Sequence, residues 1–254
     1  MAFVTNGVTV TPFVTKAMSG ERIDLPPAIL PEGEWSCVAF TVPELQGDQA
    51  HDVGWRITLD PADPPWAFGK VYIDDIRVAG TMDYTIDMSI QRMEFGEPTP
   101  FSSNDGEADI ADGTLRFRTK ADGQAFTGNY YARTAAVEAD VTPVAGASAG
   151  LLLRGQGCRR YYELGFSGEN RVSVARRENG SRTELASAVF PWSSGKTYRL
   201  GAKAEGDRLS LSVDGKTVLE ARDGRFAYGM VGVCHASGGE SRWSGFHIHA
   251  DTIE

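Results

Sequence analysis

Four stretches in the second half of the chain alternate between apolar and polar residues. They span residues 135–142, 151–154, 161–166 and 171–176. Alternation with a period of two is typical of a β-strand that is buried on one face only. If these four strands are neighbours, one sheet surface carries a set of charged and phenolic side chains. That set is Glu138, Asp140, Arg154, Tyr161, Glu163 and Arg171.

Such a surface has the groups that bind sugars. Carboxylates and guanidinium groups form paired hydrogen bonds with hydroxyls, and an aromatic ring packs against the C–H face of a sugar ring. Trp192 follows a proline and precedes a turn, so we expect it to be partly exposed and to add a second ring. The pattern therefore predicts a carbohydrate ligand. The open alternative is a solvent-facing sheet held by weak cross-strand ion pairs.

Two further groups of residues have metal-ligating side chains. Asp74 and Asp75 are adjacent carboxylates that could hold a structural Ca²⁺, or could form an acidic strand edge that discourages edge-to-edge pairing. His247 and His249 alternate on a predicted strand, and with His235 they could form a three-histidine site. Two surface histidines are the alternative. We expect no required cofactor.

The elements that must position these residues are strands. No convincing amphipathic helix is present, and strand patterns recur between Gly, Asp, Asn, Ser and Pro turns, including 36–42, 53–59 and 70–78. Asp214-Gly215 between two apolar runs is a strong hairpin signal. The fold class is therefore all-β, with two antiparallel β-sandwiches. We expect a small domain at 1–80, which is short for a complete sandwich, and a second domain at 81–254.

Charge argues against two classes of partner. The net charge is −9, and residues 1–104 hold 6 basic against 15 acidic residues. A chain without a basic surface is a poor ligand for nucleic acid or for an anionic membrane. No signal peptide is recognisable, and three widely spaced cysteines predict free thiols, although a Cys158–Cys234 pair is the open alternative. These features slightly favour a cytoplasmic location.

Several motifs resemble known β-sandwich families. The strand Tyr-Ile-Asp-Asp-Ile-Arg-Val at 72–78 resembles the closing strand of jelly-roll carbohydrate-binding modules. From residue 137 onward, Gly-Leu-Leu-Leu-Arg-Gly-Gln-Gly at 150–157 and Arg-Tyr-Tyr at 160–162 resemble the concanavalin A-like sandwich of fructan-binding modules and keto-disaccharide hydrolase-like domains. This resemblance implies a concanavalin-like, laminin-G-like second domain. It also implies that the polar sheet face binds the ligand and that Arg154 occupies the position of an arginine in those modules.

The order of the two sandwiches resembles the C-terminal accessory region of bacterial ADP-ribosylglycohydrolase-like proteins. In that family a helical catalytic domain precedes a jelly roll and a concanavalin-like domain. The resemblance implies that this chain is a non-catalytic accessory domain, associated with a glycoside hydrolase or another glycoside-processing enzyme. A carbohydrate ligand and an enzyme domain of the same parent protein are then the expected partners.

Two other functions stay open. Glu138-Ala139-Asp140 is similar to the catalytic strand of laminarinase-like glycoside hydrolases, although the second glutamate of that motif is absent. A hydrolase would use Glu138, Asp140 and Glu163 as its carboxylates. A purely structural module between domains is the third possibility. Sugar binding without turnover, turnover of a glycoside, or neither would distinguish the three.

Overall fold

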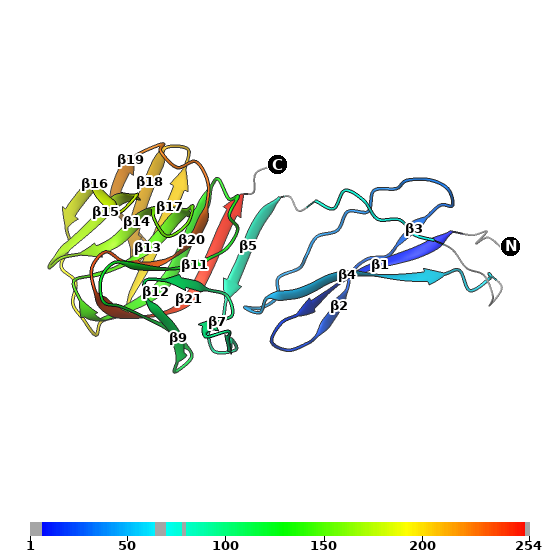
Figure 1. The fold of residues 1–254 in the computed structure, drawn as a ribbon, viewed down its shortest axis with the longest axis horizontal. Coiled ribbons are helices and arrows are strands. Elements are labelled where there is room, and N and C mark those ends of the chain that lie inside the picture. Colours follow the sequence, from blue (N-terminus) through cyan, green and yellow to red (C-terminus); the bar gives the residue numbers. More distant parts are fainter. Residues whose placement is uncertain (1–6, 64–69, 78–79, 252–254) are drawn as a thin grey trace. The chain divides into compact units, whose positions relative to one another are not determined.

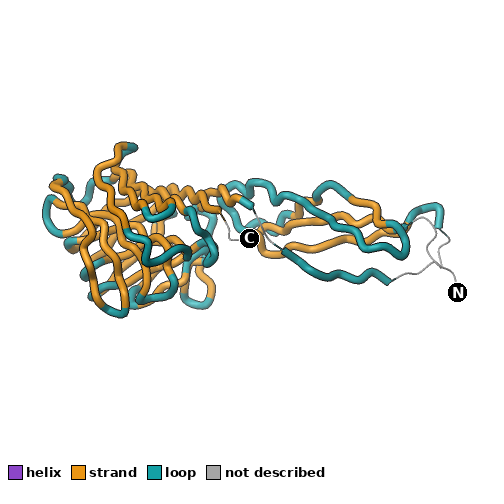
Figure 2. Tube along the Cα trace, turned by 90° about the horizontal axis from the view of Figure 1, so that it is seen from above, coloured by secondary structure: helices purple, strands orange, loops and turns teal. Residues whose placement is uncertain are grey.

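The structure, a computed structural model, describes residues 7–63, 70–77 and 80–251 of the chain. These residues form strands and loops, as the expected all-β fold class requires (Figure 2). Among them there is no helix that is long and apolar enough to cross a membrane. The chain divides into two compact units, Met1–Val78 and Ala79–Glu254. Each is described separately below.

The first unit contains one antiparallel sheet built around β1 (Val8–Lys16). Strand β4 (Ala50–Leu59) pairs with β1 along its whole length, and β2 (Arg22–Asp24) and β3 (Ala28–Leu30) share the other edge of β1 (Figure 1). The strand predicted at 36–42 is wrong, and residues 70–77 are likewise not a strand. Residue 78 lies outside the described residues.

The described part of the first unit has no second sheet, which a jelly roll would need. As a result, the apolar residues predicted on one face of β4 are largely open to solvent. Val53, Ile57 and Leu59 are 47%, 42% and 37% exposed. The small core of this unit is formed instead by Val10 and Val14 of β1 together with Leu25.

The second unit is a sandwich of two antiparallel sheets that face each other (Figure 1). One sheet has eight strands: β19 (Lys216–Arg222), β18 (Arg208–Val213), β17 (Tyr198–Glu205), β12 (Ala135–Gly146), β21 (Gly239–Asp251), β10 (Thr114–Thr119) and β9 (Glu107–Ala111), with β5 (Thr81–Ile86) paired to the end of β21. The other has seven: β16 (Ser181–Val189), β15 (Arg171–Glu178), β14 (Arg160–Ser167), β13 (Ser148–Gly155), β20 (Met230–His235), β11 (Gly123–Thr127) and β8 (Ser102–Asn104). A two-stranded ribbon joins β6 (Met93–Glu94) to β7 (Glu97–Pro98).

The alternation of the strands determines which residues fill the core between the sheets. Val137, Ala139 and Val141 of β12 point inward from the eight-stranded sheet and are at most 1% exposed. Leu164 of β14 and Val174 of β15, in the seven-stranded sheet, belong to the same core cluster. Fully buried apolar side chains of this kind each contribute about 1.5–3 kcal/mol, so the core holds both sheets firmly in register.

The expectation that the strand with Glu138 and Asp140 lies in the same sheet as the strands with Glu163 and Arg171 is wrong. Strand β12 pairs with β17 and β21 in the eight-stranded sheet, whereas β13, β14 and β15 are consecutive in the seven-stranded sheet. The chain crosses from one sheet to the other between β12 and β13. Glu138 and Asp140, which point away from the core, therefore lie on the outer surface opposite to that of Glu163.

Candidate functional site

A row of small residues crosses the outer face of the seven-stranded sheet. Strand pairing aligns Gly150 with Cys234 on one side and with Gly165 on the other, and the row continues through Ser173 to Ser187. A Cβ atom on Gly165 would lie 2.5 Å from the backbone oxygen of Ala149, so no larger residue fits there without movement. Because these side chains are small or absent, little side-chain volume covers the outer face of the sheet along this row.

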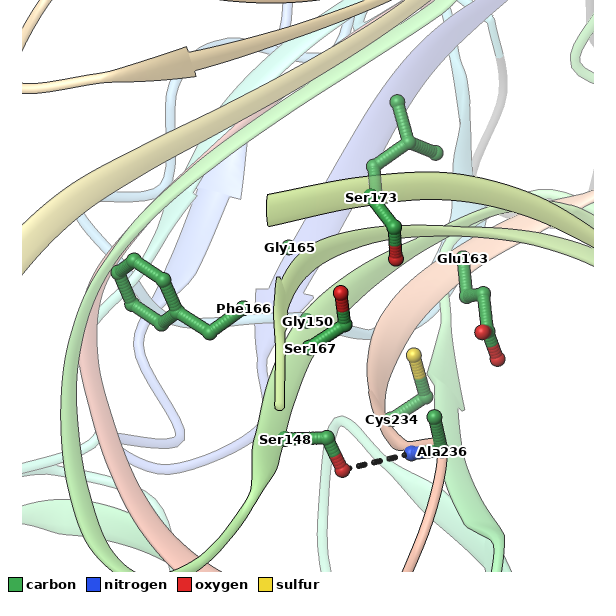
Figure 3. Close-up of a pocket in the computed structure, with 10 residues that line it drawn as sticks. Ser148, Gly150, Glu163, Gly165, Phe166, Ser167, Ser173, Cys234 and Ala236 are labelled. Atoms are coloured by element: carbon green, nitrogen blue, oxygen red, sulfur yellow. Dashed lines mark hydrogen bonds between the residues drawn. The ribbon is translucent and has the colours of Figure 1, made fainter. Parts of the chain in front are cut away.

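A hollow of about 300 Å³ lies beside this row, at the start of β13 and β15 and the end of β14. We call it the serine–arginine hollow, and its lining residues are Ala147, Ser148, Ser167, Gly168, Arg171, Arg182, Glu184, Ala236 and Ser237. A smaller gap beside it shares Ser148, Ser167 and Ala236, and extends over the two glycines to Glu163 and Ser173. The hydroxyls of Ser167 and Ser173 lie on the same side of the sheet, while the ring of Phe166 points away from them (Figure 3).

Glu163 holds the arginine side chains on one side of the hollow in place. Its side chain is only 6% exposed, and each carboxylate oxygen accepts a hydrogen bond from a different arginine. Arg177 Nε donates to Oε2 at 3.0 Å, and Arg182 Nε donates to Oε1. Burial opposes the charge of Arg177, but the Glu163 carboxylate outweighs this effect and raises the pKa of Arg177. A buried carboxylate with two arginine partners keeps their side chains in fixed positions.

Arg171 and Glu184 form the outer rim. Arg171 Nη2 donates to Glu184 Oε1 at 2.8 Å and also to the Ser187 hydroxyl. The Ser187 hydroxyl is the main cause that lowers the pKa of Glu184, and the charges of Arg171 and Arg182 act in the same direction against burial. Glu184 is therefore a carboxylate at neutral pH.

Serines close the hollow on the side of β13. Ser148 Oγ accepts the backbone N–H groups of Ala236 (3.0 Å, Figure 3) and Ser237 (3.2 Å), which fixes the loop after β20. Ser167 differs, because its Oγ is inaccessible to solvent and has no hydrogen-bond partner among the described residues. A buried hydroxyl without a hydrogen-bond partner is uncommon and destabilises the folded state. The Ser167 hydroxyl is therefore a candidate ligand contact.

The arrangement suits binding more than bond-breaking. Burial raises the pKa of the Cys234 thiol well above its usual value, so this cysteine is not a thiolate nucleophile. Both carboxylate oxygens of Glu163 already accept hydrogen bonds from arginines, so they are not directed at a reacting group. What the hollow offers is a set of fixed hydroxyl and guanidinium groups.

Glu138 and Asp140 are brought together, but not at this hollow. Both lie on the eight-stranded sheet beside Arg199, whose Nη2 is 3.3 Å from Glu138 Oε2 and whose Nη1 is 3.5 Å from Asp140 Oδ1. The side chains are 54% and 43% exposed, so this is a solvent-facing ion-pair cluster. The proposed carboxylate set of a hydrolase is thus divided between two surfaces, which overturns that arrangement.

Arg154 is buried rather than facing a ligand. Its side chain is 1% exposed and donates to the backbone oxygens of Arg133 (3.1 Å from Nη2) and Phe226 (2.9 Å from Nη1). Two loops, 128–134 and 223–229, are tied together in this way. The expectation that it shares an open surface with Glu163 is wrong, because β13 shifts register here and Arg154 has a φ of 51°, which breaks the alternation.

Two predicted aromatic residues have different positions. Tyr161 is on the expected face, but it packs with Phe126, Leu152 and Cys234 and accepts a hydrogen bond from Gln124, and burial raises its pKa. Trp192 stacks on Phe166 with ring centroids 5.0 Å apart, and its Nε1 donates to the backbone oxygen of Gly168, which lines the hollow. Trp192 therefore packs against the core and is linked to the hollow only through the backbone of Gly168.

The described residues contain no group of three His, Cys, Asp or Glu side chains that could hold a metal ion. Asp75 is bound to Arg77 at 2.8 Å, and Asp74 accepts only the backbone N–H of Asp75. His235 is fully buried against Ser148 and Ser241, whereas His247 and His249 pair with Asp83 on β5. The three-histidine site is therefore wrong. All three cysteines are free.

Of the nine residues that line the hollow, sequence reasoning proposed Arg171 alone. Arg182, Glu184 and Ser167 were not among its candidates, although Arg182 and Glu184 alternate directly after the Asn179-Gly180 turn. A hairpin at that turn pairs Arg182 with Arg177 and Glu184 with Ala175, beside Glu163. The Asn179-Gly180 turn and the alternation of Arg182 and Glu184 after it are visible in the sequence, so this hairpin could have been predicted.

Comparison with known proteins adds a fold assignment. The sequence matches no protein-family model and no curated relative. Among solved structures, the carbohydrate-binding module CBM66 from Bacillus subtilis aligns over 60% of this chain and 93% of its own, with 21% identity and a TM-score of 0.50. Over the aligned residues the chain shares the β-sandwich fold of this module. A Bacillus subtilis protein of unknown function with a galectin-like fold aligns over 61% and 91%, with 14% identity and a TM-score of 0.48. The exoplasmic domain of VIP36, bound to Ca²⁺ and Man3GlcNAc, aligns over 61% and 85%, with 13% identity and a TM-score of 0.46.

These likenesses concern the fold. Sandwiches of this type have many functions, so the function of the chain has to be argued from its own site. The likeness does not extend to the tandem arrangement or to a parent enzyme, and both stay predictions.

Proposed function

We propose that this chain binds carbohydrate, with the serine–arginine hollow as its binding site. The observation that carries the proposal is the combination of a hollow of about 300 Å³ with arginine, serine and carboxylate groups around it, of which Arg182 is held in place by the buried Glu163. This volume is at the lower end of small-molecule sites, which suits a single sugar ring. Polar walls suit hydroxyl-rich ligands better than apolar ones.

The prediction from sequence is retained in part. Glu163 holds Arg182 in place and Arg171 forms the rim, whereas Trp192 packs against the core and contacts only the backbone of Gly168. Arg154, Glu138 and Asp140 are not included, because they lie elsewhere in the fold. The fold of a carbohydrate-binding module supports the proposal without identifying the sugar.

Saturation-transfer NMR on a panel of mono- and disaccharides tests the proposal. We expect the full chain to bind at least one sugar at millimolar concentration, and Arg171→Ala to weaken that binding at least fivefold. Arg171 is the suitable residue because its side chain is 47% exposed, so its loss leaves the core intact.

The matched control is Arg199→Ala, an arginine of the other sheet that also faces two carboxylates. It should leave binding unchanged. If no sugar binds to the folded protein, the proposal is wrong and a structural module is the remaining function. If Arg199→Ala abolishes binding and Arg171→Ala does not, the ligand binds the eight-stranded sheet and the proposed site is wrong.

We also propose that the chain serves as an accessory region of a glycoside-processing enzyme. The support is the resemblance in sequence between its tandem of units and such regions. Co-purification of the chain with a catalytic domain of its parent protein, and its absence from a control purification, would support this role.

A further inference from the structure

The serine–arginine hollow has more unused hydrogen-bond donors than acceptors. Arg171 uses only Nη2, which donates to Glu184 and Ser187. Its Nε and Nη1 groups have no partner among the described residues. A guanidinium group carries five N–H donors and no acceptor, so three donors of Arg171 remain available to a ligand.

Arg182 adds to this excess. Its Nε donates to Glu163 and its Nη2 donates to Ser173 Oγ at 2.9 Å. Its Nη1 lies 3.6 Å from Glu184 Oε2, which is an ion-pair distance too long for a good hydrogen bond. The Ser167 hydroxyl, buried and unpartnered, adds one donor and can also accept.

The acceptors around the hollow are largely occupied. Both oxygens of Glu163 are taken by arginines, and the backbone oxygen of Gly168 accepts from Trp192. Ser148 Oγ already accepts two backbone N–H groups, so its own hydrogen is left for Ser237. Glu184 is the one lining carboxylate: Arg171 holds its Oε1, and its Oε2 is the acceptor that stays open, 3.6 Å from Arg182 Nη1.

Charge follows the same direction. The lining side chains include two arginines, Arg171 and Arg182, and one carboxylate, Glu184. Beneath them Glu163 is offset by Arg177, which also lies 3.5 Å from Asp122. Over these six groups the charges balance, but among the side chains that line the hollow itself two arginines stand against one carboxylate. A neutral sugar hydroxyl donates as well as accepts, whereas a carboxylate only accepts and carries one negative charge.

We propose that the sugar bound in the serine–arginine hollow is an acidic one, a uronic acid whose carboxylate pairs with the free edge of Arg171. This inference rests on the proposed function and names its ligand class. The planar fork of the guanidinium matches a carboxylate in bidentate fashion. A sugar phosphate is the less suitable anion, because its second charge would face Glu184.

Titration of the 15N-labelled full chain followed by NMR tests the inference. The probes are D-glucuronate and D-galacturonate against D-glucose and D-galactose, which are the same rings without the carboxylate. We expect the uronates to bind at least about tenfold more tightly, which corresponds to about 1.4 kcal/mol. Their affinity should fall when the salt concentration is raised from 50 to 500 mM, while binding of the neutral sugars stays constant.

Two variants locate the effect. Arg171→Gln should remove the preference for the uronates, and Arg199→Gln, on the other sheet, should keep it. Ser167→Ala removes one donor without a charge, so it should weaken uronate binding to a smaller extent. The amide spectrum of each variant shows directly whether the fold is kept.

The outcomes separate this inference from the proposed function. Equal affinity for neutral and acidic sugars, lost in Arg171→Ala, overturns the acidic preference and leaves sugar binding in place. Tighter binding of glucose 6-phosphate than of glucuronate overturns the carboxylate as the recognised group. Uronate binding that depends on Arg199 and not on Arg171 also overturns it. Absence of binding by every sugar removes both proposals.

Discussion

Replacement of Arg154 should destabilise the protein instead of removing a ligand contact. The change is Arg154→Met, which keeps an apolar stem of similar length and deletes every donor. In the folded chain the guanidinium donates to the backbone oxygens of Arg133 and Phe226, and so holds two loops against the end of the sandwich. Without it, both carbonyl groups lose their charged partner.

The expected cost follows from those contacts. A buried acceptor left without a partner costs about 1–3 kcal/mol, and two acceptors are affected. Burial lowers the pKa of Arg154, so the removal of its charge returns part of this cost. We expect a net loss of about 2–4 kcal/mol in the free energy of unfolding of the second unit. For a unit of this size that corresponds to a fall in Tm of roughly 5–15 °C.

Urea unfolding followed by circular dichroism measures this loss. Hydrogen exchange should also accelerate in residues 129–134 and 224–229, and stay slow in the central strands. Arg171→Met is the control, and it should change the free energy of unfolding by less than about 1 kcal/mol because its ion pair is exposed. An Arg154→Met protein of wild-type stability that had lost sugar binding would refute this reasoning and restore the ligand role of Arg154.

Three further outcomes are expected. Gly165→Ala should lower the free energy of unfolding by about 1–3 kcal/mol, because the added Cβ meets the backbone of β13. Gly224→Ala, where there is room for a Cβ, should leave it unchanged. Urea unfolding measures both variants, and equal losses would contradict the packing argument. Burial lowers the pKa of His235 from 6.5, so its contribution to stability is complete above pH 6.5 and is lost as the pH falls through the lowered pKa. The free energy of unfolding, measured from pH 8 to pH 5, should therefore decrease with falling pH. His235→Gln should reduce this decrease, and an unchanged decrease would assign it to another group. Burial raises the pKa of Asp48, but hydrogen bonds from three backbone N–H groups outweigh burial and lower it. The contribution of Asp48 to the stability of the first unit should therefore be lost only as the pH falls below about 4. Asp48→Asn should cost about 1–2 kcal/mol at pH 7, and thermal unfolding at pH 7 and below pH 4 measures both effects.

The fold could be predicted from the sequence because local alternation determines which face of a strand is buried. The prediction of inward residues at 137, 139 and 141, and at 162, 164 and 166, agrees with the core of the second unit. The hydrophobic pattern alone carries this information. The strand predicted at 36–42 was wrong for a related reason, since an apolar run forms a strand only where a neighbouring strand completes its hydrogen bonds.

The site was harder to predict, because it depends on which strands become neighbours. Residues 135–142 and 151–154 are close in sequence and both alternate, yet β12 and β13 belong to different sheets. Nothing in the local pattern distinguishes a hairpin from a crossing between the layers of a sandwich. Glu163 and Arg171 were placed correctly on one face because β14 and β15 are joined by a tight turn.

Arg154 shows the same limit on a smaller scale. Alternation places it with Glu163 only while the strand stays regular, and the register of β13 shifts between Leu152 and Gly155. The positive φ at Arg154 turns its side chain toward the loops. A hairpin reaches its partner through a short turn, so its register can be read from the sequence. This is why the hairpin of β15 and β16, which brings Arg182 beside Glu163, is the part of the hollow that sequence alone could have supplied. The bulge at Arg154 depends on contacts with residues about 20 and 70 positions away, and only the folded chain shows them.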